Sequence, residues 1–175
     1  MSFRRLVNRL IYCMVFTITF SPIVSAEGFK PYEVKAVYLF RIANFIQWNN
    51  ESLMDSVQFC VMGNQKVADT LISITNGKSI RSLPIHVQQT ISPECNITYL
   101  SDVERGSIET ELNSNDISPN MVTISDTLNF TELGGVIELT RINNKIKPKI
   151  NLTNAKRGNY IIGSNLLRIS IVEGK

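Results

Sequence analysis

The stretch from Gly134 to Leu152 constrains the fold more than any other, because it predicts a β-hairpin in a single register. Apolar and polar residues alternate on both sides of Asn143-Asn144, and asparagine tolerates the positive φ that a two-residue hairpin turn requires. Such a turn pairs Ile142 with Lys145. The pairs that follow are Leu139 with Pro148, Ile137 with Ile150, Val136 with Asn151, Glu138 with Lys149 and Thr140 with Lys147. A shift of one residue would exchange the two faces, so burial of one face specifies the register.

The register divides the hairpin into an apolar face and a polar face. The apolar face collects Ile137, Leu139, Ile146, Pro148, Ile150 and Leu152. The polar face collects Glu138, Thr140, Lys145, Lys147 and Lys149. Its three lysines are candidate contacts for an acidic partner, which they would attract by electrostatic steering. A strand face that is simply solvated explains the same pattern.

The first 26 residues have the organisation of a secretory signal peptide, which predicts export. Arginines within the first nine residues form a basic region, the apolar run from Leu10 to Phe20 follows, and Val24-Ser25-Ala26 supplies small residues for cleavage. An apolar run of that length is too short to span ~30 Å of hydrocarbon, which argues against an uncleaved membrane anchor. We expect cleavage after Ala26, which leaves residues 27–175 as one domain.

The charge balance excludes nucleic acid as a partner. The chain has 18 Lys and Arg against 15 Asp and Glu, and the excess lies in the three arginines of the predicted signal peptide. The basic residues of the remaining chain are concentrated after residue 135. Such asymmetry is compatible with a polarised surface for a charged partner, or with two halves that neutralise each other on folding. No basic domain with interleaved aromatic residues is present.

The cysteines predict one disulfide bond. Cys13 leaves with the signal peptide, so Cys60 and Cys95 are the remaining thiols. Two such thiols pair in an oxidising compartment. Closing a loop of roughly 35 residues stabilises a fold by about 3–4 kcal/mol in the chain-entropy account. A catalytic thiol is the alternative, but the single histidine, His86, lies in an alternating run that is typical of a strand.

No catalytic or metal-binding constellation is present in the sequence. The chain contains no G-x-S-x-G, no H-E-x-x-H, no phosphate loop and no C-x-x-C. His86 is not accompanied by a second residue with metal-ligand spacing. We therefore expect no enzymatic activity, no metal and no cofactor.

The segment from Tyr32 to Trp48 is expected to form the first helix. Its apolar stripe consists of Ala36, Leu39, Ile42, Ala43 and Ile46. Val37 and Trp48 lie on the opposite, polar arc, and they are our candidate contacts for a protein partner. The alternative for Trp48 is a side chain folded back onto the core. Lys35 projects from the apolar side, where it either extends its stem to reach water or pairs with a buried carboxylate.

The remaining pattern alternates strands with helices, which predicts an α/β fold. Strands are expected at 56–62, 83–88, 97–100, 121–124 and 160–162, and helices at 65–74, through Ile108 and Leu112, and after a Thr153 cap. We expect a single three-layer domain with a mixed, mainly parallel sheet and flanking helices. The β-hairpin would add antiparallel strands in the C-terminal third.

Several segments resemble the YfiR-like family of periplasmic proteins. Residues 32–39, YEVKAVYL, and 45–48, FIQW, resemble its N-terminal signature. The later segments that resemble it are ISD at 124–126, GGVIEL at 134–139, INL at 150–152 and SNLL at 164–167. These segments occur in the family's order across residues 27–175, so the resemblance covers the whole predicted domain.

The resemblance implies a regulator that lies in the periplasm. Proteins of this family repress a membrane-bound diguanylate cyclase by binding its periplasmic sensor domain, which controls cyclic-di-GMP and biofilm formation. An outer-membrane lipoprotein can sequester the repressor. The alternative function is a periplasmic small-molecule-binding domain with a pocket near the strand ends, which would act on another membrane signalling protein. A homodimer is compatible with either function.

Overall fold

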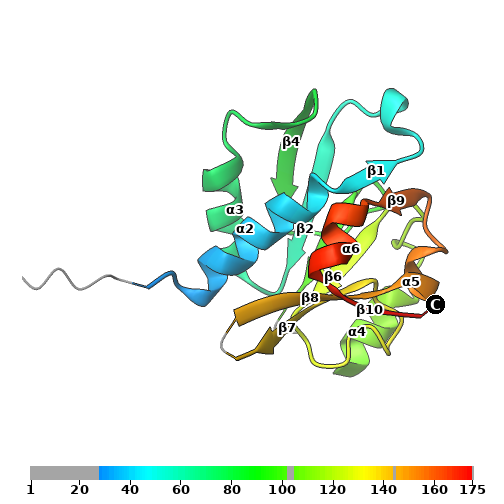
Figure 1. Cartoon of the computed structure of the whole chain (residues 1–175). Helices are drawn as coiled ribbons and strands as arrows, with labels where there is room; N and C mark the ends of the chain where they lie inside the picture. Colours follow the sequence, from blue (N-terminus) through cyan, green and yellow to red (C-terminus); the bar gives the residue numbers. More distant parts are fainter. Residues whose placement is uncertain (1–27, 102–104, 144, 175) are drawn as a thin grey trace, which may run out of the picture.

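An eight-stranded sheet forms the centre of the protein in the computed structural model, which describes residues 28–101, 105–143 and 145–174 (Figure 1). In order across the sheet, the strands are β10 (Ile171–Glu173), β8 (Lys145–Asn151), β7 (Ile137–Ile142), β6 (Val122–Ser125), β5 (Ile97–Leu100), β2 (Val57–Met62), β4 (Leu83–Gln88) and β3 (Ser79–Ile80). β7 with β8 and β3 with β4 are antiparallel, whereas the other five neighbouring pairs are parallel. The predicted signal peptide lies outside the described residues.

Helices cover both faces of this sheet, which confirms the predicted three-layer α/β fold (Figure 1). Alternate residues of one strand belong to different cores: Phe59 and Val61 of β2 join the large core, whereas Cys60 and Met62 join two smaller ones. The large core also contains side chains of α2 (Pro31–Ala43), α3 (Gln65–Thr75) and α6 (Ser164–Ile169). The opposite face carries α4 (Arg105–Leu112), whose Ile108 is buried in a smaller core.

The hairpin of β7 and β8 has the register that the sequence predicts. Ile142 pairs with Lys145, and the ladder continues to Ile137 opposite Ile150. Asn143 has a φ of +48°, the left-handed conformation for which asparagine is suited. Its neighbour Asn144 lies outside the described residues. On the apolar face, Ile137, Leu139, Pro148 and Ile150 are buried, while Ile146 and Leu152 are partly buried.

The first helix is shorter than expected, because α2 ends at Ala43. Residues Ile46–Trp48 form strand β1, which pairs antiparallel with β9 (Tyr160–Ile162) in a separate two-stranded sheet. Ile46 and Trp48 are buried and Gln47 is exposed, the period of two that belongs to a strand. Asn44 closes the helix through a side-chain bond to the Phe40 carbonyl (2.7 Å). The prediction of a helix through Trp48 was therefore wrong.

The other differences concern short elements. The helix α5 (Leu152–Ala155) is capped by Asn151, whose side-chain oxygen accepts from the Thr153 and Asn154 N–H groups at 3.0 and 3.2 Å. Thr153 is therefore not the cap that we expected. The short strands β3 and β10 were not predicted, because two or three residues are too few to establish a period.

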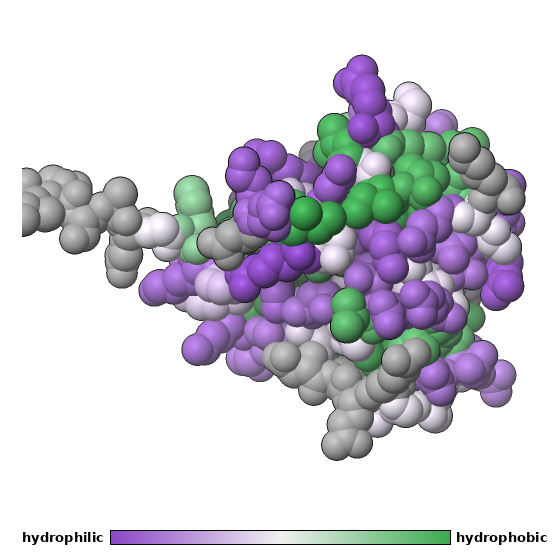
Figure 2. All heavy atoms as spheres, turned by 60° about the horizontal axis from the view of Figure 1, so that its bottom comes forward, coloured by the Kyte–Doolittle hydropathy of each residue, from purple (hydrophilic) through white to green (hydrophobic). Residues whose placement is uncertain are grey.

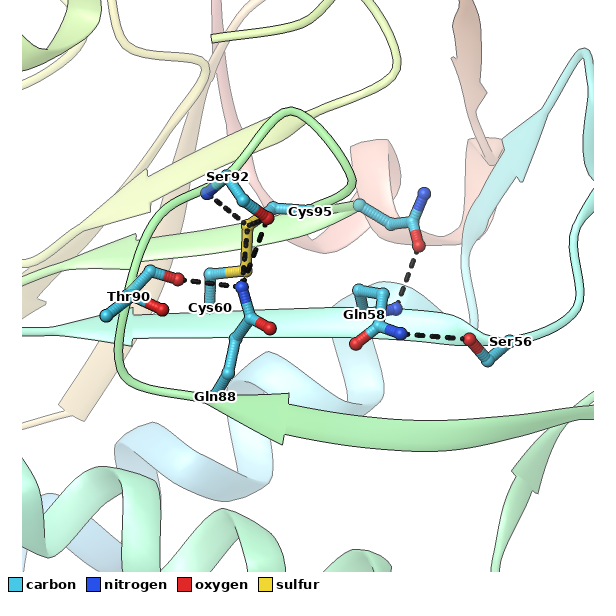
Figure 3. The surroundings of a disulfide bond; sticks show 8 residues. Ser56, Gln58, Cys60, Gln88, Thr90, Ser92 and Cys95 are labelled. Carbon is cyan, nitrogen blue, oxygen red and sulfur yellow. Dashed lines mark hydrogen bonds between the residues drawn. A yellow bond between two sulfur atoms is a disulfide. The ribbon is translucent and has the colours of Figure 1, made fainter. Parts of the chain in front are cut away.

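Cys60 and Cys95 form the predicted disulfide bond, which joins the middle of β2 to the chain just before β5 (Figure 3). Their Cα atoms are 5.9 Å apart, and both residues are fully buried beside Met121. The Ser92 N–H lies 3.2 Å from the Cys95 sulfur. The bond therefore fastens the loop between β4 and β5 to the centre of the sheet.

Replacing both cysteines by alanine should lower the free energy of unfolding by about 3–4 kcal/mol, because the unfolded chain regains the entropy that the cross-link removes. The double variant leaves no unpaired thiol. Urea denaturation of the oxidised protein and of the variant measures the difference. Equal midpoints with equal slopes would show that the bond contributes nothing to stability.

Candidate functional site

Trp48 is part of the core and not of the surface. Its side chain is 2% exposed, and its indole N–H donates to the Asn120 carbonyl at 2.9 Å. The Arg81 guanidinium lies 5.8 Å from the centre of the ring. The alternative of a side chain folded back onto the core therefore describes Trp48, and the indole is not accessible to a partner in this conformation.

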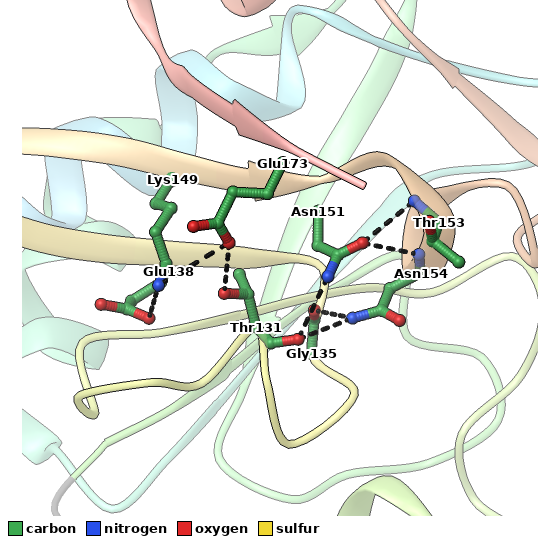
Figure 4. A network of polar contacts seen from close by, with 8 residues as sticks. All are labelled: Thr131, Gly135, Glu138, Lys149, Asn151, Thr153, Asn154 and Glu173. Atoms are coloured by element: carbon green, nitrogen blue, oxygen red, sulfur yellow. Dashed lines mark hydrogen bonds and ion pairs between the residues drawn. The ribbon is translucent and has the colours of Figure 1, made fainter. Parts of the chain in front are cut away.

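The three lysines of β8 have different surroundings. Lys145 and Lys147 are exposed, whereas the Lys149 side chain is 14% exposed and lies 3.3 Å from the Glu138 carboxylate. Glu138 is only 2% exposed. Figure 4 shows the Lys149 ammonium between Glu138 and Glu173, with Thr131 donating to Glu173 at 3.2 Å. Lys149 thus links β8 to β7 and β10 through its two ion pairs. Of the three lysines, only Lys145 and Lys147 are exposed to solvent.

Val37 lines an open hollow between α2 and α6. The hollow has a volume of about 850 Å³ and is lined mainly by apolar side chains. Among its lining residues are Phe29, Val34, Val37, Phe45, Leu166 and Ile169. Phe29 is 86% exposed and Ile169 is 54% exposed. α2 therefore has two apolar sides, one against the sheet and one toward this hollow.

Large exposed apolar side chains occur on several elements of the domain, and two of them lie at the α2–α6 hollow. On the face drawn in Figure 2, apolar atoms gather in a band that is bordered by hydrophilic residues. The large apolar side chains with the greatest exposure among the described residues are Phe29, Leu53, Ile72, Leu128, Ile142, Ile161 and Ile169. Two of these, Phe29 and Ile169, lie at the α2–α6 hollow. Clustered apolar exposure is typical of an interaction surface.

Two smaller hollows lie beside the first, toward the tip of the hairpin. One, of about 430 Å³, is lined by Val34, Tyr38, Arg141 and Lys145 among others. The other, of about 380 Å³, shares Arg141 with it and adds Lys35 and Asp126. The Tyr38 hydroxyl donates to the Ile146 carbonyl at 2.7 Å, which ties α2 to β8 between these hollows.

A polar cluster lies at the carboxyl ends of β5 and β6, around Asp126. The Lys35 ammonium is 2.5 Å from one carboxylate oxygen of Asp126. The other oxygen accepts from the Tyr99 hydroxyl at 2.6 Å and from the Ser101 hydroxyl at 3.0 Å. Lys35 therefore pairs with a partly buried carboxylate, the second of the two alternatives that its position in the sequence allowed.

These contacts determine the charge state of Asp126. Burial raises the pKa of its carboxyl, but the hydrogen bonds from Lys35, Tyr99 and Ser101 and the positive charge of Lys35 lower it by more. The pKa of Asp126 consequently lies below its ordinary value. The carboxylate is ionised at neutral pH and is held by three donors, so it is not available as an acid or a base.

The cluster lies beside the position where ligands bind in many α/β proteins. The parallel strands lie in the order β4, β2, β5, β6, β7 across the sheet. β4 is added on one side of β2, whereas β5, β6 and β7 are added on the other side, so the strand order reverses between β2 and β5. In sheets of this order, ligands bind outside the carboxyl ends at the reversal. Here Ser101, directly after β5, donates to Asp126, and Lys35 of α2 completes the pairing. The polar groups at this edge are bonded to one another.

The described part of the chain contains no group of three or more His, Cys, Asp or Glu residues arranged to hold a metal ion. Within the same residues, no helix combines the length and the hydropathy needed to cross a bilayer.

The sequence analysis missed two residues: Arg141, which lines a surface hollow, and Asp126, which is the centre of the polar cluster. Arg141 follows Ile137 and Leu139 at a spacing of two, so the alternation that defines the apolar face also places a charge at its end. That signal was available in the hairpin register. Asp126 lies two positions after the strand predicted at 121–124, but nothing in the sequence connects it with Lys35, which lies 91 positions earlier. Only the folded chain brings this pair together.

Fold and site together define a disulfide-bonded, doubly wound α/β domain with an open apolar groove and an internally paired polar cluster. A comparison with known protein families identifies the family of this domain. Residues 32–171 match the family described as YfiR/HmsC-like, and the chain belongs to this family. None of the curated proteins that were compared with the chain matches it. The family match confirms the resemblance found in the sequence.

The ion pair of Lys35 with Asp126 should stabilise the fold by about 1–3 kcal/mol at neutral pH, because removing one partner leaves the other partly buried without its counter-charge. Since the pKa of Asp126 is lowered in the folded state, this stabilisation is fully present above the ordinary Asp pKa of about 3.9. It should decline as the pH falls from that value through the lower pKa of the folded state, because the unfolded chain takes up the proton first.

A double-mutant cycle with Lys35→Met and Asp126→Asn, followed by urea denaturation at neutral pH and near pH 3, measures this coupling. We expect a coupling energy at neutral pH that declines in acid. A coupling that is zero, or that grows as the pH is lowered, would contradict the assignment.

Proposed function

We propose that this chain is an exported periplasmic regulator that holds a membrane diguanylate cyclase inactive by binding the cyclase's periplasmic sensor domain. The observation that carries the proposal is membership of the YfiR/HmsC-like family over residues 32–171. The export signal expected in residues 1–26 and the Cys60–Cys95 bond both suit an oxidising compartment outside the cytoplasm. The proposed output is the level of cyclic-di-GMP in the cell, and through it biofilm formation.

The surface of the domain supports a binding function rather than turnover of a substrate. The groups with acid–base chemistry at the carboxyl edge, Lys35, Tyr99 and Asp126, are bonded to one another. The 850 Å³ hollow beside α2 is apolar and open, which suits contact with another protein. A non-enzymatic regulator needs only such a surface and no cofactor.

Repression requires that the protein distinguish two states of the cyclase. A ligand shifts a conformational equilibrium only by the difference between its affinities for the two states. Moving a 99:1 preference for the active state to a 1:99 preference takes about 5.5 kcal/mol of such a difference. An outer-membrane lipoprotein that covers the same surface would withdraw the repressor and release the cyclase.

Deleting the gene should raise cyclic-di-GMP, because the cyclase then returns to its active state. The nucleotide is quantified by mass spectrometry in the deletion strain, in the parent and in a strain complemented with the full chain. Complementation should restore the parental level. An unchanged level in the deletion strain, with the cognate cyclase present, would remove the support for a repressor and would favour the small-molecule-binding alternative.

Export should remove residues 1–26, so the protein recovered from the periplasm should begin at Glu27. Intact-mass analysis of the periplasmic fraction, with and without a reductant and a thiol-alkylating reagent, measures both the start of the chain and the state of Cys60 and Cys95. We expect alkylation only after reduction. A protein that retains its N-terminal segment, or one that is found in the cytoplasm, would contradict the proposed location.

A further inference from the structure

The three hollows beside α2 adjoin one another and share lining residues. Val34 and Tyr38 line both the 850 Å³ hollow and its 430 Å³ neighbour. Arg141 and Ile146 line both that neighbour and the 380 Å³ hollow. The groove, which we call the α2 groove, therefore runs from α6 across the outer side of α2 to the hairpin of β7 and β8.

The middle of the α2 groove has the spacing of a helix-binding surface. Ala36, Leu39 and Ile42 of α2 are buried against the sheet. Val34, Val37 and Tyr38, at the spacing i, i+3 and i+4, are only partly buried and line the groove. A helix that is apolar on so much of its circumference is normally covered on all sides. The outer side of α2 thus presents an apolar row to a further element.

The hairpin end of the α2 groove is basic. Arg141 and Lys145 both line it, and within the described residues neither has a carboxylate within ion-pair distance. The carboxylates that line the groove have partners within the chain: Glu33 accepts from the Lys30 N–H at 2.9 Å, Asp126 is paired with Lys35, and Glu138 is paired with Lys149 at 3.3 Å. Arg41 adds a further positive charge toward the α6 end. The groove therefore complements a partner with apolar anchors and acidic residues.

We propose that the α2 groove binds an amphipathic helix of the cyclase's periplasmic domain, whose apolar face packs on Val34, Val37 and Ile169 and whose acidic residues meet Arg141 and Lys145. This inference rests on the proposed function and identifies the contact surface. Because α2 has 13 residues, an occupant that lies along it would be about 20 Å long. Helices in such grooves are held through anchors at i, i+3, i+4 and i+7.

The shape and the charge of the groove disfavour two other occupants. A small ligand binds in a pocket that encloses most of its surface, whereas this groove is open along three connected hollows. A second copy of the chain, docked groove to groove, would bring the cations Arg141 and Lys145 of both chains into one interface, where neither has a carboxylate partner within its own chain among the described residues. Like charges in that arrangement repel, so self-association through this groove is unfavourable.

Photo-crosslinking in the living cell tests the occupant directly. A photoreactive amino acid replaces Val37 in the full-length chain, and His86 is the control position, because it is exposed on β4 and does not line the groove. We expect the Val37 position to crosslink to the membrane cyclase, at a peptide with apolar residues at helical spacing and with Asp or Glu nearby. The His86 position should give no such product.

Several outcomes of this experiment would overturn the proposal. They are a crosslink between two copies of this chain, a crosslink to a small molecule or a lipid, a cyclase peptide without helical spacing, and equal crosslinking from both positions. The absence of any product at Val37, with the cyclase present and repressed, would overturn it as well.

Charge reversal tests the basic end of the groove. The variant Arg141→Glu/Lys145→Glu should weaken binding of the purified chain to the detergent-solubilised cyclase by about tenfold or more. The dissociation constant of the variant should also change much less with ionic strength than that of the parent chain. The matched control is Lys156→Glu/Arg157→Glu, which makes the same change of charge at exposed residues that do not line the groove. Thermal unfolding of both variants shows whether they fold. Equal weakening by the two folded variants would refute a specific contact.

The two proposals fail in different ways. If deletion of the gene leaves cyclic-di-GMP unchanged, the proposed repressor function fails. If deletion raises cyclic-di-GMP but the Arg141→Glu/Lys145→Glu variant represses as well as the parent chain, only the assignment of the groove fails.

Discussion

The register of the β7–β8 hairpin is the constraint on which the C-terminal third depends. It places Ile137 and Ile150 in the large core and sets Glu138 opposite Lys149. Lys149 then reaches Glu173 of β10, which pairs parallel with β8 and completes the sheet at that edge. A slip of one residue would turn the apolar side chains to water and would bury lysines without partners. The same register carries Arg141 to the end of the α2 groove.

The helix α2 connects the core with the proposed binding surface. Its inner side chains pack on the sheet, Lys35 pairs with Asp126, and the Tyr38 hydroxyl bonds to β8. These polar contacts fix the rotation of the helix about its axis, which apolar packing alone specifies less strictly because both sides are apolar. The outward row of Val34 and Val37 is thereby held in one orientation. A preorganised surface of this kind loses less conformational entropy on binding.

The sequence predicted the hairpin and the α/β class because both depend on local signals, namely alternation, helical spacing and turn chemistry. It also indicated Val37 as a candidate contact, since an apolar residue on a polar arc stands out in a helical wheel, and this stays a prediction. It misplaced Trp48, because β1 has three residues and is a strand only by pairing with Tyr160–Ile162. It did not find that Asp126 is the partner of Lys35, or that Arg141 lines a hollow beside α2. Those residues are far apart in the chain, and their proximity produces no periodic pattern in the sequence.

An exposed apolar groove is a liability for a folded domain unless a partner covers it. Burial of the groove would give affinity, but the same burial in both states of a cyclase would produce no repression. Discrimination must therefore come from a segment whose position or exposure differs between those states. A helix that is free to dock in one state and is packed within the cyclase in the other satisfies this requirement. The basic end of the groove would then set the direction in which that helix lies, because reversing it would move its acidic residues away from Arg141 and Lys145.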